Sequence, residues 1–207
     1  MKSPGIENII FDLGNTLCFF DFCYFYDGVA KLEKHLDARK FKSFIRSKKL
    51  GDAVSKGRLE HKTLFYKLKR KFNLKISYSD FTYLYCDIFW ENTPMKNFLE
   101  QIAGRKKFKL FLLSNTCSQH IRFIYRNFPY VNLIKNKILS FKVKILKPDK
   151  KIFRYVLDKY NLKPERTLII DDLLENITAA KSLGMVGIHY SKHKSFLQKF
   201  RKITNNQ

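Results

Sequence analysis

Side chains able to bind a metal and a phosphate group stand at four points of this 207-residue chain: Asp12, Ser114-Asn115, Lys147 and Asp171-Asp172. All except the lysine directly follow a short apolar run. Three carboxylates gathered in one crevice repel one another, by about 4 kcal/mol per pair at ~4 Å and an effective dielectric constant of ~20. A divalent cation removes that penalty, and oxygen ligands favour Mg²⁺, which also binds substrate phosphate oxygens. The set therefore predicts a magnesium site and a phosphorylated substrate.

The elements that must position these groups alternate between short strands and helices. The apolar runs predict strands over residues 8–11, 108–113, 167–170 and 185–189. Helix-period patterns between or beside them cover residues 94–103, 118–127, 148–160 and 173–183. This alternation predicts an α/β fold with a parallel sheet between two helical layers, and ligands of such sheets bind at the carboxyl ends of the strands. The residues after Phe200 are expected to fray.

A long segment without a convincing strand separates the first strand from the second. It contains helix-period stretches over residues 24–36, 38–50, 59–72 and 79–90. The pattern predicts an all-helical insert. We therefore expect a core formed by residues 1–17 and 96–207, and a helical domain formed by residues 18–95.

Four motifs in register resemble those of the haloacid dehalogenase-like (HAD) superfamily. They are Phe11-Asp12-Leu13-Gly14-Asn15-Thr16, Leu113-Ser114-Asn115-Thr116, Lys147-Pro148 and Asp171-Asp172-x-x-x-Asn176. The resemblance covers essentially the whole chain, because the helical insert falls where the family's C1 cap is inserted. It implies a Rossmann-like core with a C1 helical cap. It also implies a Mg²⁺-dependent phosphatase, similar to the branch that acts on glucose 1-phosphate.

The resemblance implies a role for each motif residue. Asp12 would be the nucleophile that forms an aspartyl-phosphate. Ser114 and the backbone around Leu13, Gly14 and Asn115 would hold the phosphoryl oxygens, and Lys147 would neutralise their charge. The metal would be held by Asp12, the Gly14 carbonyl and Asp172, with Asp171 binding directly or through water, and Asn176 would orient this loop from behind the ligands.

Gly14 departs from the family's usual phosphatase pattern, which has a second Asp at this position to protonate the leaving group. Loss of such an acid typically costs about 10²- to 10⁴-fold in rate. Two interpretations follow. In the first, the substrate has a good leaving group, as a sugar 1-phosphate or an acyl phosphate does. In the second, the protein is a catalytically weakened module that binds phosphate or a partner. Water or Asp21 would take part of the acid's role, unless Asp21 is an ordinary turn residue. Retention of Asp171-Asp172 favours phosphate chemistry over the metal-free dehalogenation of other family members.

The net charge of +23 is concentrated in two segments, residues 31–75 and 101–170. No nucleic-acid motif accompanies these bases, so we interpret them as a solvated surface rather than a nucleic-acid site, with attraction for anionic substrates as the alternative. The four cysteines lack zinc-site spacing, which predicts reduced thiols. No signal-peptide pattern or bilayer-length apolar run is recognisable. We expect a cytoplasmic protein that acts on a small phosphorylated metabolite without a membrane partner, in an oligomeric state that the sequence leaves open.

Overall fold

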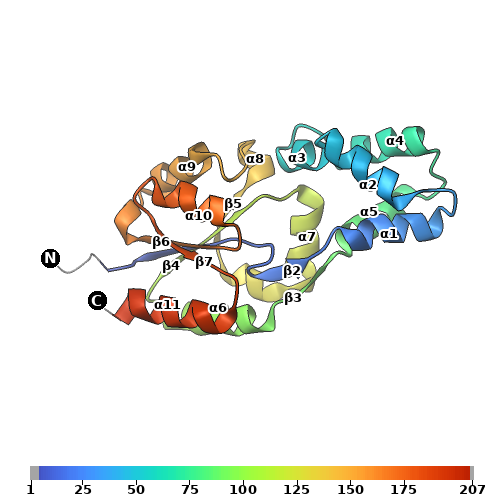
Figure 1. Cartoon of the computed structure of the whole chain (residues 1–207). Coiled ribbons are helices and arrows are strands. Elements are labelled where there is room, and N and C mark those ends of the chain that lie inside the picture. The colour runs from blue at the N-terminus through green and yellow to red at the C-terminus, as the bar shows by residue number, and fades with distance from the viewer. Residues whose placement is uncertain (1–4, 206–207) are drawn as a thin grey trace.

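The computed structural model describes residues 5–205 and contains a parallel five-stranded sheet of order β5-β4-β1-β6-β7 (Figure 1). Its strands are β1 (Asn8–Phe11), β4 (Lys109–Ser114), β5 (Asn136–Leu139), β6 (Thr167–Asp171) and β7 (Val186–His189). Central strand β1 is paired on both sides, so that Phe11 lies opposite Leu112 and Ile170. The parallel α/β sheet predicted from the apolar runs is confirmed, and the carboxyl ends of β1, β4 and β6 lie side by side.

Two helical layers cover the sheet because successive side chains of a strand point to opposite faces. Ile10, Phe111 and Ile169 face the layer of α9 (Lys150–Tyr160) and α10 (Leu174–Lys181). Ile9 and Leu112 face the layer of α6 (Thr93–Arg105), α7 (Ser118–Asn127) and α11 (His193–Asn205). Figure 1 shows α9 and α10 on one side of the strands and α6 and α11 on the other. Short α8 (Ser140–Val143) and the 3₁₀ turns η1 (Pro129–Leu133) and η2 (Pro164–Arg166) complete the sheet's surroundings.

A second group of helices lies beyond the carboxyl ends of the strands, at the right of Figure 1. Its members are α1 (Cys23–Leu32), α2 (Ala38–Ser47), α3 (Leu50–Ser55), α4 (His61–Phe72) and α5 (Tyr78–Cys86), and together they are called the helical insert below. Its centre is an aromatic cluster of its own, in which the Phe25 ring lies 5.8 Å from Phe41 and 5.2 Å from Phe81. The helical insert therefore has a hydrophobic core separate from that of the sheet.

Two short strands connect the helical insert to the sheet. β2 (Cys18–Phe20) pairs antiparallel with β3 (Phe89–Glu91), and the pair Phe19 and Trp90 brings two rings within 6.0 Å. The expectation that residues 18–95 contain no strand is therefore wrong at both ends of the segment. Each run is only three residues long, and its partner lies far away in the sequence, so neither has a local pattern that reveals the pairing.

The helical insert touches the core again through the segment after α3. The Ser140 hydroxyl of α8 donates a hydrogen bond to the Ser55 carbonyl at 2.6 Å. Gly57 follows in the left-handed region, at φ 63°, and a Cβ there would collide with the Phe141 carbonyl oxygen. Only glycine meets both requirements without strain. The helical insert is thus held by the β2–β3 pair, by this contact and by α5, whose Tyr85 carbonyl lies 2.9 Å from His120 Nε2 of α7.

Other differences from the sequence prediction have local causes. The stretch predicted as one helix over 38–50 is two helices, because Lys49 adopts a left-handed conformation with φ 48°. β5 was missed because half of its four residues are polar. Residues 201–205, expected to fray, continue α11, which Phe200 anchors against Phe98 at 4.9 Å; residues 206–207 lie outside the described part. No helix within residues 5–205 has the length and apolar character needed to cross a membrane, and all four cysteines are free thiols.

Candidate active site

The fold brings the predicted polar residues to one edge of the sheet. Ser114 and Asp171 are the last residues of β4 and β6, and Asp12 directly follows β1. The Asp12 backbone amide donates to the Ile170 carbonyl at 2.9 Å, which continues the ladder one residue past β1. Lys147 enters from the segment between α8 and α9. Residues from four distant parts of the sequence therefore meet at this edge.

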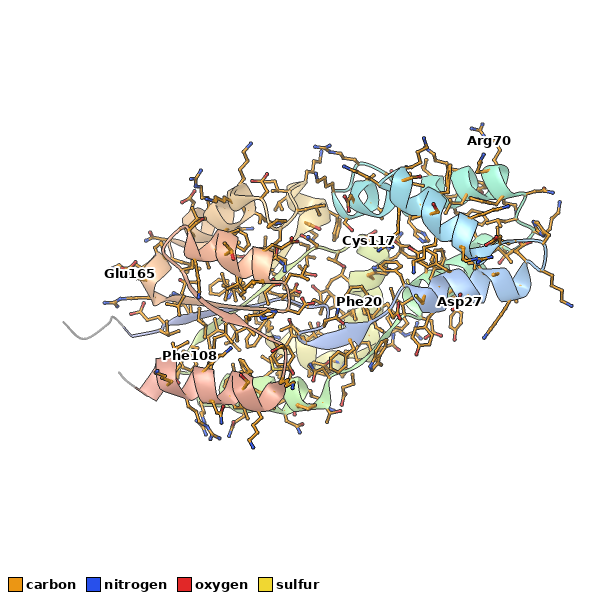
Figure 2. All side chains as sticks on the ribbon, in the orientation of Figure 1. Phe20, Asp27, Arg70, Phe108, Cys117 and Glu165 are labelled. Carbon is orange, nitrogen blue, oxygen red and sulfur yellow. The ribbon has the colours of Figure 1, made fainter. Side chains whose placement is uncertain are left out.

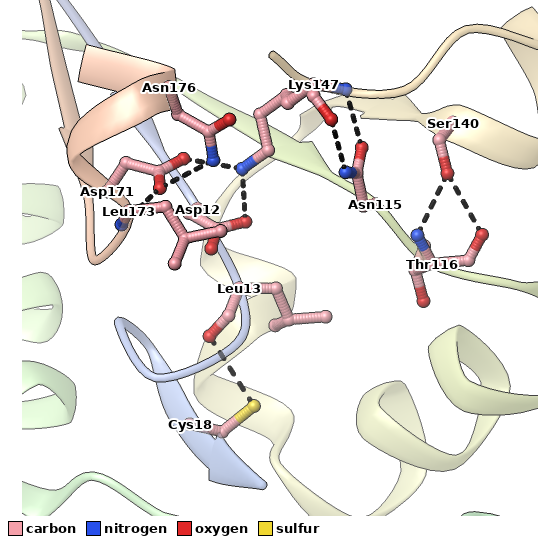
Figure 3. Close-up of polar contacts among 10 residues, drawn as sticks. All are labelled: Asp12, Leu13, Cys18, Asn115, Thr116, Ser140, Lys147, Asp171, Leu173 and Asn176. Atoms are coloured by element: carbon pink, nitrogen blue, oxygen red, sulfur yellow. Dashed lines mark hydrogen bonds and ion pairs between the residues drawn. The ribbon is translucent and has the colours of Figure 1, made fainter. Parts of the chain in front are cut away.

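Lys147 joins two of the carboxylates. Its Nζ lies 2.6 Å from Asp12 Oδ1 and 2.6 Å from Asp171 Oδ2, as Figure 3 shows. The three side chains are almost fully enclosed, with exposed fractions of 2%, 10% and 0% for Lys147, Asp12 and Asp171. Because a buried charge is tolerated only when it is paired, the ammonium and the carboxylates hold one another in place.

The Asn115 side chain fixes the backbone of Lys147. Its Nδ2 donates to the Lys147 carbonyl at 2.9 Å, and its Oδ1 accepts a hydrogen bond from the Lys147 amide, also at 2.9 Å. The sequence predicted phosphate binding by the Asn115 backbone; the structure shows this additional clamp between the end of β4 and the lysine segment. Ser114, which precedes the clamp, is buried.

Both oxygens of Asp171 have partners. Oδ2 pairs with Lys147, while Oδ1 accepts hydrogen bonds from the Leu173 amide at 2.9 Å and from Asn176 Nδ2 at 2.8 Å. Asn176 thus contacts the acidic loop from behind, where the sequence expected it (Figure 3). Since its oxygens are already engaged, Asp171 is better suited to contact a metal through water than directly.

The acidic residues form a cluster that fits a metal ion. Asp12, Asp171 and Asp172 each offer a ligand atom, and these atoms lie within 4.8 Å of one another. The fully ionised cluster carries two surplus negative charges, because the Lys147 ammonium balances only one of the three carboxylates. A divalent cation balances that surplus, and an all-oxygen donor set is the kind that Mg²⁺ prefers.

The pKa values of the three side chains reflect the same excess of negative charge. Burial raises the pKa of Asp12 to about 7, and Asp171 and Asp172 add to the rise while Lys147 opposes it. Burial, followed by the charge of Asp171, also raises the pKa of Asp172. Burial alone would lower the pKa of Lys147, but Asp12 and Asp171 raise it above its usual value. Lys147 therefore stays charged, and the carboxylates need further positive charge to ionise fully.

The space beside Gly14 is occupied by an aromatic ring. An ideal Cβ on Gly14 would lie 2.5 Å from Cε1 and 2.9 Å from Cδ1 of Phe20. An aspartate at position 14 would therefore fit only if Phe20 moved. Asp21, the other candidate for the acid's role, is exposed, and its Oδ1 accepts a hydrogen bond from the Cys23 amide at 2.7 Å. That contact begins α1, as expected for an ordinary turn residue.

Three residues that contribute to this site were not predicted from sequence patterns. Phe20 fills the space beside Gly14 because β2 pairs with β3. The Ser140 hydroxyl accepts a hydrogen bond from the Thr116 amide at 2.9 Å and so holds the loop after β4. His189 Nε2 lies 2.8 Å from the Asp172 carbonyl. All three act through contacts between residues distant in sequence, and no motif marks them.

Solved structures share this fold. A HAD family enzyme from Bacteroides thetaiotaomicron superposes with a TM-score of 0.85 at 23% identity, covering 96% of this chain and 100% of that one. The same enzyme has been solved in complex with magnesium and inorganic phosphate, a structure that superposes with a TM-score of 0.74 at 23% identity over 90% of this chain and 95% of that one. At this level of identity the likeness concerns the fold.

Curated relatives match parts of the chain. A phosphorylated carbohydrates phosphatase from Thermotoga maritima is 26% identical over 110 residues, which is 53% of this chain and 50% of that protein. Bifunctional epoxide hydrolase 2 from Rattus norvegicus is 34% identical over 70 residues, which is 34% of this chain and 13% of that protein. These alignments span half or less of the relatives' length. The family model for haloacid dehalogenase-like hydrolases, in contrast, matches residues 6–184 and so includes every residue of the cluster. The chain belongs to the haloacid dehalogenase-like hydrolases.

Proposed function

We propose that this protein is a Mg²⁺-dependent phosphatase that hydrolyses phosphate monoesters of small metabolites. The observation that carries the proposal is the bridge of Lys147 to Asp12 and Asp171, at 2.6 Å each, beside the third carboxylate of Asp172. The proposed nucleophile Asp12, a buried positive charge and the possible metal ligands therefore lie together. The Bacteroides enzyme bound to magnesium and phosphate, and the Thermotoga phosphatase, support the same chemistry.

Each residue of the site has a part in the proposed reaction. Asp12 attacks phosphorus and forms an aspartyl-phosphate, which water then hydrolyses. Ser114 and the backbone of Leu13, Gly14 and Asn115 bind the phosphoryl oxygens, and Lys147 neutralises their charge. Mg²⁺ would be held by Asp12, the Gly14 carbonyl and Asp172, with Asp171 contacting it through water, and when bound it supplies positive charge opposite the phosphoryl group.

Residues 18–95, which include the helical insert, would form a cap over the core of residues 1–17 and 96–207. A cap that closes over the strand ends excludes water and selects the substrate. Because Phe20 excludes an acid from position 14, substrates whose leaving group needs little protonation are favoured. Sugar 1-phosphates belong to this class, and the Thermotoga phosphatase of phosphorylated carbohydrates makes them the first to assay.

The Phe20 ring also supports a second function. If no group donates a proton to the leaving oxygen, the site binds a phosphate group without turning it over, and the protein is a phosphate- or partner-binding relative of the hydrolases. Both functions use the same bridge of Lys147 between the two carboxylates. They differ in turnover.

Phosphate release distinguishes the two. The assay compares the native chain, Asp12→Asn and the control Asp158→Asn, an exposed position on α9, with sugar, acyl and alkyl phosphates in Mg²⁺ or in chelator. We expect turnover that requires Mg²⁺, survives in the control and falls to background in Asp12→Asn. Turnover that persists in Asp12→Asn or in chelator would contradict the mechanism. A folded native chain that binds phosphate but turns over no substrate would be the binding protein.

A further inference from the structure

A cavity of about 280 Å³ lies in the helical insert, lined by residues of all five of its helices. Its apolar lining consists of Phe22, Phe25, Tyr26, Ile45, Leu64 and Tyr85. An apolar cavity of about 150 Å³ is large enough to bind benzene, so this volume is large enough for a substituted ring. Four of the six apolar side chains are aromatic, so the cavity has the size and the walls for one substituted ring.

Ring contacts connect the cavity with the catalytic edge of the sheet. The Phe22 ring lies 6.0 Å from Phe20, and Phe20 fills the space beside Gly14, two residues after Asp12. Figure 2 shows Phe20 at the junction between the strands and the helical insert. On the other side, Tyr85 stacks at 4.4 Å on His120, in the first turn of α7 after the Ser114-Asn115 motif. One wall of the cavity is thus a single ring contact away from Phe20, which lies beside Gly14, and another wall is a single ring contact away from α7.

The mouth of the cavity is positively charged. Arg46 and Lys49 line it from the end of α2 and the following turn, against the single acidic side chain of Asp52. An anionic ester is attracted to such an opening. A sugar would place hydroxyl groups against Phe22, Phe25, Ile45 and Leu64, and each hydroxyl left without a hydrogen-bond partner there costs binding free energy.

We propose that the substrates are phosphate monoesters of aromatic hydroxyl compounds, with the ring bound in this cavity. The inference rests on the proposed phosphatase function and narrows its substrate class. The absent acid at Gly14 points to the same class, because a phenolic hydroxyl has a pKa near 10, about six units below that of water, and leaves without a donated proton. The ring walls and the missing acid are independent features of the chain.

The chemistry of the step balances without a further reactant. An Asp12 oxygen forms a bond to phosphorus while the bond from phosphorus to the aryl oxygen breaks, and the phenolate leaves with the bonding electron pair. The phenolate takes a proton from solvent. Water then attacks the aspartyl-phosphate, which frees inorganic phosphate and restores the Asp12 carboxylate. The net reaction converts an aryl phosphate and water to a phenol and phosphate.

The test compares kcat/KM of the full chain, with Mg²⁺, for phenyl phosphate, cyclohexyl phosphate, glucose 1-phosphate and acetyl phosphate. Gly51 also lines the cavity, and a Cβ there meets nothing within 4 Å, so Gly51→Trp adds a large side chain to the cavity lining without a clash at its Cβ. Gly104→Trp, at an exposed position of α6, is the matched control, since its Cβ position is equally open. We expect phenyl phosphate to exceed glucose 1-phosphate and cyclohexyl phosphate at least tenfold. Gly51→Trp should lower the ratio of phenyl to acetyl phosphate turnover at least tenfold, and Gly104→Trp should leave that ratio unchanged.

The outcomes separate the substrate class from the function itself. Equal or better turnover of glucose 1-phosphate overturns the aromatic assignment while the phosphatase stands. Equal turnover of cyclohexyl phosphate shows that the leaving group does not matter, and an unchanged ratio in Gly51→Trp shows that the ring binds elsewhere; each also overturns it. If even acetyl phosphate is not hydrolysed, the phosphatase function fails and the substrate class fails with it.

Discussion

An aspartate introduced at position 14 tests whether the missing proton donor limits this enzyme. The substitution Gly14→Asp alone places a Cβ 2.5 Å from the Phe20 ring. Forcing extra atoms into packed space typically costs about 1–3 kcal/mol, so this variant should be less stable and its carboxylate displaced. Phe20→Ala removes the obstacle. The informative protein is therefore the double variant, compared with Phe20→Ala alone.

The expected gain depends on the leaving group. A positioned general acid is worth about 10²- to 10⁴-fold in rate, which corresponds to about 3–5 kcal/mol of activation free energy. Relative to Phe20→Ala, the double variant should gain about 10²-fold or more with alkyl phosphates, whose leaving oxygen needs a proton. With acetyl phosphate, whose leaving group is already stable as an anion, the gain should stay below about tenfold.

Initial rates of phosphate release in saturating Mg²⁺, together with thermal unfolding of each variant, measure both effects. The reasoning is refuted if the double variant gains equally with alkyl and acetyl phosphates, because the new carboxylate then does not act as an acid. It is also refuted if Gly14→Asp alone keeps the native unfolding temperature and gains as much as the double variant. In that case the Phe20 ring does not occupy the acid's position.

Three further predictions concern the bridge, a buried histidine and the contact between the helical insert and α8. Lys147→Met leaves the paired carboxylates without their cation, so in chemical denaturation without metal the free energy of unfolding should fall by about 3–5 kcal/mol. Exposed Lys151→Met should show no such loss. Mg²⁺ should restore more stability to Lys147→Met than to the native chain, and equal shifts would count against the metal site. Burial lowers the pKa of His120 to about 4, below the unfolded value near 6.5, so stability present above pH 6.5 is lost as the pH falls, by about 2 kcal/mol between pH 6.5 and 5. Urea unfolding at pH 6.5 and pH 5 should show that this loss of stability disappears in His120→Gln. A loss of the same size in that variant would show that His120 does not cause it. Gly57→Ala, at φ 63° against the α8 backbone, should lower the unfolding temperature and speed proteolysis of the 55–59 segment, whereas Gly104→Ala should do neither; equal protection of both variants would show that this contact is dispensable.

The meeting of the candidate catalytic groups was predictable because it depends on short apolar strands. Asp12, Ser114 and Asp171 follow continuous apolar runs, and once these runs are neighbouring parallel strands their ends must lie together. Lys147 is different. Its position depends on the Asn115 clamp and on two ion pairs across the crevice, and only the family's motif pointed to it. Chemistry fixed by strand geometry can be read from sequence, whereas chemistry fixed by side-chain contacts across the fold requires either a motif or a structure.

The cavity and the filled space beside Gly14 were beyond sequence reasoning for the same physical reason. Both depend on aromatic side chains whose partners come from β2, β3 and the helices of the insert, and aromatic rings carry no local signal of what they will face. Phe20 lies between the two features: its ring fills the space beside Gly14 and lies 6.0 Å from the ring of Phe22, which lines the cavity. The aromatic walls of the cavity and the glycine at position 14 are separate observations, and both favour the same leaving group in the proposed reaction, one that is stable as an anion and aromatic.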